Sequence, residues 1–292
     1  MKSHILITGA TGNVGTEVVR ELQRKGIPFR VGAYDTAKAA TQLKTAGDIV
    51  LFDFLDPGTY SSAFEGIEHV FLVRPPALSN VERDIAPAIQ AAGKAGVKHI
   101  VFLSIQGVEN NRVVPHYKIE QAILNAGIQY TFLRASFFMQ NLSTTHASEI
   151  RDQDEIALPV GNARTSFIDV RDIAAVAVCA LTDGGHANQS YTLTGAEALN
   201  YDEVAAKLSA KLGRLIRYTH LPMLNFIWRQ LKAGQTLPYT LVITALYTIT
   251  RLGNASTVTT DTQQILGREP IRFDQFALDY RQSWERQAAI PG

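Results

Sequence analysis

Three glycines near the start of the chain repeat at a spacing of three residues: Gly9, Gly12 and Gly15. An uncharged apolar run, Ile5 to Ile7, precedes them, and valines and leucines at helical spacing follow as far as Lys25. In a strand–turn–helix unit the first glycine permits a sharp turn, the second admits a bulky anion, and the third lets the helix pack on the strand. The helix N-terminus then faces a pyrophosphate. The pattern predicts a dinucleotide site, and the alternative is a glycine-rich surface loop.

Composition narrows the class of protein. The chain has 292 residues, 46% hydrophobic and 19% charged, with a formal net charge of +1. This balance gives no footprint of a nucleic-acid or anionic-membrane partner. The single cysteine, Cys179, lies in an apolar helical run, excludes an intrachain disulfide framework and fits a reducing cytoplasm. No signal peptide is visible, and the apolar stretch 237–249 is too short and too polar to span a bilayer. We expect a cytoplasmic protein.

The elements that must position the glycine turn alternate between strands and helices. Strands are predicted at residues 5–7, 29–33, 48–52, 70–73, 99–103 and 130–133. Helices are predicted at residues 14–25, 36–45, 56–66, 80–95 and 116–125. Repeated strand–helix units of this length predict an α/β fold, a Rossmann-type doubly wound parallel sheet with dinucleotide across the carboxyl ends of its strands. Residues 1–155 are expected to form this part.

The remainder, residues 156–292, is expected to be a smaller, mostly helical part without a clear linker. A last strand is predicted at 191–193 and helices at 201–212 and 221–232, while 240–250 is open between helix and strand because β-branched residues crowd it. We expect these segments to fold back over the sheet as the other wall of a substrate pocket. Residues 221–247, which include Trp228, predict an apolar wall with a mobile lid, and plain core packing is the alternative.

Several segments together resemble NmrA-like proteins, which are atypical short-chain dehydrogenase/reductases. The resemblance runs to about Asn200 and is carried by residues 8–15, 70–73, 96–101, 134–141 and 167–173. The family includes NADPH-dependent quinone and triphenylmethane-dye reductases, and regulators that bind the cofactor without turning it over. Some relatives carry the label nucleoside-diphosphate-sugar epimerase. The resemblance therefore implies the fold and a dinucleotide, and the reaction only weakly.

Carried over to this chain, the resemblance implies a set of cofactor and substrate residues. The pyrophosphate falls to Gly9, Thr11, Gly12, Asn13 and Val14, the adenine to Asp53 and Phe54, and the ribose to Leu72, Val73 and Arg74. The nicotinamide side falls to Ser104, which is a candidate catalytic residue, and nicotinamide or substrate to Ser136, Phe137 and Phe138. Each has an ordinary alternative: Asp53 could cap a turn, Arg74 could be solvated, and the two phenylalanines could be core.

One departure concerns the reaction. Short-chain dehydrogenases usually carry Tyr-x-x-x-Lys, in which the tyrosine protonates the carbonyl oxygen. Here Gln121 stands four residues after Tyr117, and alignment on Ile119-Glu120 puts His116 at the lysine position and Arg112 at the tyrosine position. His116 could replace the lysine, binding ribose or shuttling a proton near neutral pH, or it could be a surface histidine at a helix start. A quinone or dye reductase is therefore ranked first, a non-catalytic redox sensor with a protein partner second, and an epimerase third.

The residues after the second strand bear on which dinucleotide is bound. Tyr34 stands where relatives that use NADPH often place an arginine, and Asp35 could take the ribose diol. Lys38, and Arg30 less directly, could supply charge to a 2′-phosphate. We expect NADP(H) or NAD(H), with a slight preference for NADP(H), no metal, and a small-molecule substrate. The sequence leaves open whether two copies form a homodimer.

Overall fold

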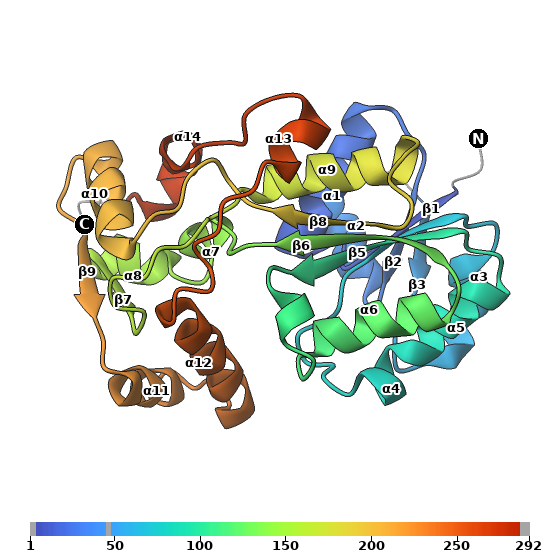
Figure 1. The fold of residues 1–292 in the computed structure, drawn as a ribbon, viewed down its shortest axis with the longest axis horizontal. Helices are drawn as coiled ribbons and strands as arrows, with labels where there is room; N and C mark the ends of the chain where they lie inside the picture. Colours follow the sequence, from blue (N-terminus) through green and yellow to red (C-terminus); the bar gives the residue numbers. More distant parts are fainter. Residues whose placement is uncertain (1–3, 45–47, 287–292) are drawn as a thin grey trace, which may run out of the picture. The chain divides into compact units, whose positions relative to one another are not determined.

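The computed structural model describes residues 4–44 and 48–286, and the chain divides into two compact units (Figure 1). Unit 1 comprises Met1–Ala135, Val170–Leu193 and Asp261–Arg268, and unit 2 comprises Ser136–Asp169, Thr194–Thr260 and Glu269–Gly292. This division differs from one cut near residue 155, because the chain returns to unit 1 twice after leaving it. The returning segments carry a helix and a strand of the main sheet, and then a further helix.

Unit 1 is built on a seven-stranded sheet in which every neighbouring pair is parallel, in the order β3-β2-β1-β4-β5-β6-β8. The strands are β1 (Ile5–Thr8), β2 (Arg30–Ala33), β3 (Asp48–Leu51), β4 (His69–Leu72), β5 (His99–Ile105), β6 (Gln129–Ala135) and β8 (Gln189–Leu193). The strand order reverses direction between β1 and β4, the switch point at which doubly wound sheets bind nucleotides. The predicted fold class is confirmed.

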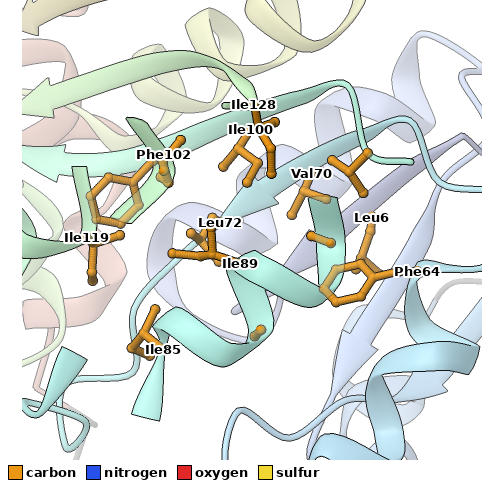
Figure 2. Packing of buried hydrophobic residues seen from close by; sticks show 14 of the residues in the cluster. Leu6, Phe64, Val70, Leu72, Ile85, Ile89, Ile100, Phe102, Ile119 and Ile128 are labelled. Carbon is orange, nitrogen blue, oxygen red and sulfur yellow. The ribbon is translucent and has the colours of Figure 1, made fainter. Parts of the chain in front are cut away.

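Helices cover both faces of this sheet. On one face α1 (Asn13–Arg24) packs along α9 (Val170–Thr182), and on the other lie α3 (Tyr60–Phe64), α5 (Ala86–Lys94) and α6 (Pro115–Asn125) (Figure 1). The remaining helices of unit 1 are α2 (Thr36–Leu43), η1 (Pro57–Thr59), α4 (Val81–Asp84), η2 (Val108–Asn110) and α13 (Asp261–Leu266). An apolar core lies between the sheet and the helices α3, α5 and α6, and Figure 2 shows it from close by. Leu72, Phe102 and Ile119 belong to this core.

The single helix predicted over residues 80–95 is wrong, because the structure breaks it into α4 and α5 at Ile85. Pro87 lies in the first turn of α5 and has no N–H to donate to the carbonyl four residues earlier. Asn80 caps α4 by accepting the backbone N–H of Arg83. The proline therefore starts a new helix where apolar periodicity alone predicted continuity.

Unit 2 combines a small parallel sheet with several helices. Its strands β7 (Glu155–Leu158) and β9 (Arg217–His220) pair with each other, and neither was predicted, so 191–193 is not the last strand. Its helices are α7 (Gln140–Ser143), α8 (Ala147–Gln153), α10 (Tyr201–Leu212), α11 (Met223–Lys232), α12 (Leu237–Arg251), α14 (Phe273–Asp279) and η3 (Arg281–Trp284). The open segment 240–250 is thus helical. Across the described ranges, none of the helices combines the length and apolarity needed to cross a bilayer.

Candidate functional site

Two of the three glycines in the turn are required by its backbone geometry, and the third leaves room for a ligand. Gly9 has φ +62, and a Cβ there would come within 2.8 Å of the Val73 Cβ atom. A Cβ on Gly15 would clash with the backbone of Gly9 and Ala10, so the helix packs directly on the turn. Gly12 is different, because it has extended backbone and a Cβ would meet only the Gly9 carbonyl oxygen, at 3.4 Å. Gly12 therefore leaves an open space that the fold itself does not require.

The first turn of α1 borders this space. Gly12 is the N-cap, no side chain among the described residues caps the helix, and no acidic residue lies in its first turn. The N–H groups of Asn13, Val14 and Gly15 belong to the first turn, where helices have no intrahelical acceptor. Together with the helix dipole they form an anion site. Thr11 is held in place by Gln42, whose Nε2 donates to its carbonyl at 2.8 Å. These residues fit a pyrophosphate.

The residues that follow β2 include the exposed Tyr34 and a positive side chain, Lys38 of α2. Tyr34 is 76% exposed. Asp35 caps α2, because its Oδ1 accepts the backbone N–H of Lys38 at 2.9 Å, which leaves Oδ2 for a ligand. Lys38 is exposed and forms no ion pair with any described residue. Arg30 cannot serve here: it starts β2 at the opposite edge of the sheet, where Asp48 binds its Nε at 2.6 Å.

The adenine candidates after β3 have structural roles of their own. The Asp53 carboxylate accepts the backbone N–H of Leu55 at 2.9 Å and so closes the turn, as the alternative supposed. Phe54 is 6% exposed and packs edge-on against Phe52, with ring centroids 4.8 Å apart. The backbone of Asp53 is engaged as well, because its N–H donates to Thr59 Oγ1 and its carbonyl accepts the N–H of Asp56. These roles do not test adenine contact, since the bond from Leu55 engages one of the two carboxylate oxygens of Asp53. Their binding role stays a prediction.

The residues after β4 lie beside the glycine turn. Leu72 is buried in the core, and Val73 touches the place where a Gly9 side chain would be. Arg74 folds back over its own loop: Nη1 donates to the carbonyls of Pro75, Pro76 and Leu78 at 2.9–3.0 Å. Burial lowers the pKa of Arg74. The guanidinium is held in one position and is largely withdrawn from water.

His116 lies at the start of α6, which begins at the carboxyl edge of the sheet because it follows β5. Its ring stacks on Phe102, with centroids 6.0 Å apart and planes 29° apart. Burial, and then the positive charge of Arg74, lower the pKa of His116 to about 3. The imidazole is therefore neutral near pH 7. It can donate or accept a hydrogen bond. A proton shuttle near neutral pH, which was one of the predicted roles, is not favoured by a pKa this far below 7.

Ser104 is buried in β5, and its hydroxyl donates to Glu120 of α6 at 2.6 Å. The same carboxylate accepts two bonds from Arg134 of β6, at 3.2 and 2.8 Å. Ser104 thus belongs to a buried charged network that ties α6 to the sheet. Sequence reasoning missed Glu120. Its signal was an acid next to Ile119 on the inward side of a helix, together with an arginine inside the apolar strand 129–135.

Tyr117 points elsewhere. With Arg112 and Gln121 it lines a groove of about 340 Å³ between α6 and the helices α4 and α5. His116, one residue earlier, stacks on the core instead. The two side chains therefore face different sides of α6. Tyr117 does not stand in for the usual catalytic tyrosine beside His116.

Ser136, Phe137 and Phe138 follow β6 directly and begin unit 2. The hydroxyls of Ser136 and Ser166 lie 3.1 Å apart, within hydrogen-bond distance. Phe137 packs partly against the core of unit 2, and the backbone of Phe138 forms a parallel bridge with Ile168. The structure therefore gives these residues packing roles in unit 2, and their contact with substrate stays a prediction.

Comparison with known proteins agrees with this architecture. The chain belongs to the NmrA-like family, whose sequence model matches residues 1–274. It is similar to the NAD(P)H azoreductase of Xenophilus azovorans, with 37% identity over 279 residues, 94% of this chain and 96% of that relative.

Two solved structures share its fold. The triphenylmethane reductase of Citrobacter sp. has a TM-score of 0.84 at 25% identity, covering 95% of this chain and 100% of that one. The NADPH-dependent quinone oxidoreductase of Escherichia coli, complexed with NADPH, has a TM-score of 0.84 at 22% identity, covering 94% and 98%. At that identity the second comparison shows the fold alone.

Proposed function

We propose that this protein is an NAD(P)H-dependent oxidoreductase that reduces a quinone-like or other electron-poor small molecule. The observation that carries the proposal is the open, uncapped anion site formed by Gly12 and the first turn of α1. Support for the reaction comes from the relative named NAD(P)H azoreductase and from the fold shared with a triphenylmethane reductase. A dinucleotide, when bound, supplies the hydride.

The residues at the carboxyl edge favour acceptors that do not need a strong acid. Reduction of a simple ketone leaves an alkoxide, which requires a poised proton donor. His116 is neutral near pH 7, and Tyr117 faces the outer groove. A quinone avoids this demand because its reduced form is a stabilised anion. The chain's own residues therefore bind and orient the reactants, and His116 offers a hydrogen bond.

The test measures nicotinamide oxidation with a panel of acceptors. We expect turnover with naphthoquinones and a triphenylmethane dye, and little or none with simple ketones or sugars. His116→Ala should lower turnover by about tenfold, equal to about 1.4 kcal/mol, as expected for the loss of one hydrogen bond, with a smaller change in cofactor affinity. Tyr117→Phe should have less effect than His116→Ala, since the two side chains face different sides of α6.

Two results would contradict the proposal in different ways. Rapid reduction of ketones would require an acid that these residues do not supply. Tight cofactor binding without turnover on any acceptor would instead support the redox sensor. A pull-down for a protein partner, with and without the cofactor, would then be the next experiment.

Three finer statements belong to the same proposal. A preference for NADP(H) is supported by the exposed Lys38 in α2, the helix that follows β2. A reducing cytoplasm is supported by the lone Cys179, a half-buried thiol whose pKa is raised by burial. Homodimer formation is tested directly by light scattering of the purified protein.

A further inference from the structure

Arg74 is a fixed positive charge that forms no ion pair with any residue in the described part of the chain. Its Nη1 is engaged by three backbone carbonyls. Nε is buried and has no hydrogen-bond partner, and within the described ranges neither Nε nor Nη2 donates to any group. A buried charge is costly unless it is paired. Nη2, which together with Nε normally binds a carboxylate or phosphate side-on, is therefore left for a group that the described residues do not supply.

A second arginine of unit 1, Arg30, makes the same kind of backbone contacts as Arg74 and also has an acidic partner. Arg30 also uses Nη1 to bind three backbone carbonyls, those of Ser62, Ala63 and Glu65, at 2.9–3.1 Å. Its Nε edge, however, binds Asp48 at 2.6 Å. The two arginines share the same clamp and differ in the missing carboxylate. An anionic group at Arg74 would complete the arrangement already present at Arg30.

The position of Arg74 indicates which anion this is. Arg74 follows β4, which lies on the other side of β1 from β2. The adenosine end of a dinucleotide lies toward β2, so its nicotinamide end lies toward β4 and β5. The pyrophosphate already has the N-terminus of α1. The charge of Arg74 also reaches His116, which begins α6 at the same carboxyl edge. Arg74 therefore stands on the side where hydride would leave.

We propose that Nη2 of Arg74 binds the acceptor oxygen that becomes negative during reduction. The inference rests on the proposed function and identifies a catalytic residue for it. The acceptor, a quinone, gains one hydride as the nicotinamide is oxidised. That hydride carries two electrons and one proton. The product is the hydroquinone monoanion, which then takes a proton from water. A preorganised cation at the developing oxyanion lowers the barrier to hydride transfer.

The kinetic experiment follows a single turnover of NADPH with menadione in wild type, Arg74→Met, Arg74→Lys and Arg30→Met. We expect Arg74→Met to slow hydride transfer by about 100-fold, as loss of an oxyanion donor does. Arg74→Lys should lie between it and wild type, because lysine keeps the charge and loses the fork. Arg30→Met removes an equal clamp and charge at the opposite edge and should leave the rate unchanged. NADPH affinity, by calorimetry, should change by less than about threefold in the Arg74 variants, about 0.7 kcal/mol.

Other outcomes overturn the assignment. Wild-type hydride transfer in Arg74→Met would remove Arg74 from the reaction. An equal loss of NADPH affinity and rate would assign Arg74 to a cofactor phosphate instead. If Arg74→Met fails to fold, Arg74→Lys decides, and a wild-type rate in that variant counts against the proposal.

A second measurement needs no turnover and so separates this inference from the proposed function. 2-Hydroxy-1,4-naphthoquinone is an acid whose anion is coloured, and its ionisation is followed by absorbance in the complex with NADP⁺. In wild type the pKa of the bound naphthoquinone should be lower than in Arg74→Lys or Arg74→Met. The difference from Arg74→Met should be about one unit or more, equal to about 1.4 kcal/mol. Equal values in wild type and Arg74→Met would overturn the inference. Failure of wild type to reduce any acceptor would overturn the proposed function alone.

Discussion

At the residue scale, Gly9 and Gly15 determine the shape of the turn, and Gly12 leaves room for a ligand. A side chain on Gly9 would meet Val73 at positive φ, and one on Gly15 would enter the turn's backbone. At Gly12 the extended backbone accepts any residue, and the added atoms enter the open side. Mutations at these positions should therefore separate folding from binding.

Gly12→Val should abolish dinucleotide binding and leave the thermal unfolding temperature nearly unchanged. Gly15→Ala, the matched control, should instead lower the free energy of unfolding, by about 1–3 kcal/mol for a forced contact in a packed site. Calorimetry with NADPH and NADH measures the first effect, and a melting curve the second. Unchanged binding in Gly12→Val would remove the cofactor from this turn.

Mutations of Ser104 and Glu120 can show whether Ser104 acts in catalysis or only stabilises the fold. Removing Glu120 would deprive Arg134 of its buried partner and leave it the exposed Glu109, 3.3 Å away. Glu120→Ala should therefore cost about 3 kcal/mol of unfolding free energy. Ser104→Ala deletes one hydrogen bond to that carboxylate and should cost about 1–2 kcal/mol. Urea unfolding and turnover are measured on the same samples. A turnover loss in Ser104→Ala that exceeds its effect on folding would support the predicted catalytic role, whereas wild-type turnover would leave Ser104 purely structural.

The sequence predicts residues well where their partners are close in the chain. The glycine turn and the Asp56 cap of η1 lie within a few residues of what they contact. Ser104 and Arg134 lie 16 and 14 residues from Glu120, and their pairing depends on the register of β5 against β6. The clamp of Arg74 depends on loop carbonyls that no side-chain pattern reveals. For this reason Arg74 was predicted as a binding residue, but its lack of an ion-pair partner among the described residues was not predicted.

At the element scale, α2 carries the two residues that we expect to distinguish NADPH from NADH. Asp35 is engaged as its N-cap through one oxygen, and Lys38 is exposed without an ion pair among the described residues. Neither device for the ribose or the 2′-phosphate is complete. We expect NADPH and NADH affinities to differ by less than about a hundredfold, 2.7 kcal/mol.

Lys38→Ala should weaken NADPH binding severalfold and leave NADH binding unchanged, because only NADPH carries the 2′-phosphate. Lys94→Ala, which removes an exposed lysine at the end of α5, is the matched control. Calorimetry with both dinucleotides decides. An equal effect of Lys38→Ala on the two would show that the lysine does not read the phosphate.

The helices α11 and α12 display several large apolar side chains to solvent. Leu224 is 79% exposed, Trp228 61% and Leu241 53%. If this hairpin supplies apolar contacts to the acceptor, Leu224→Ser and Leu241→Ser should each raise the KM for a naphthoquinone by about tenfold, equal to about 1.4 kcal/mol of lost burial. Leu278→Ser, on α14 of the same unit, is the control, since Leu278 is 53% exposed. Unchanged KM values in both test variants would leave the hairpin without a substrate role.

The errors in predicted elements have physical causes. Apolar periodicity runs through Ile85, but Pro87 lacks a donor and divides the helix. Strands β7 and β9 are four residues each and pair across about sixty residues, so neither is recognisable alone. The segment 240–250 was ambiguous because β-branched residues favour strands by propensity. Its packing with α11 and the Phe226–Tyr247 ring contact favour the helix.

At the scale of the whole molecule, local alternation of strands and helices was sufficient to predict the doubly wound sheet. It was not sufficient to predict how the chain is shared between units. The strand β8 joins β6 at the edge of the sheet although residues 136–169 intervene in unit 2. Such returns depend on tertiary packing of α9 against α1, which sequence periodicity does not specify.

The buried His99 and the partly buried His116 make the stability of unit 1 sensitive to acid. Burial, and then the nearby His69, lower the pKa of His99 from 6.5 to about 4, and burial lowers that of His116 to about 3. Between about pH 4 and 6.5 the unfolded chain therefore binds more protons than the folded one. Stability from these groups is present above pH 6.5 and is lost as the pH falls.

His99→Gln should remove the His99 part of this loss. Wild type should lose about 3 kcal/mol from His99 alone between pH 6.5 and 4, at about 1.4 kcal/mol per pH unit. Glutamine keeps a donor for the hydroxyl of Thr131, which lies 2.9 Å from His99 Nε2, and it does not titrate. The free energy of unfolding is measured by urea titration at several pH values. The variant should be the less stable at pH 8, where the packing change dominates, and the gap should narrow or reverse toward pH 4. Parallel pH profiles for the two proteins would show that His99 is not the group whose protonation destabilises the fold.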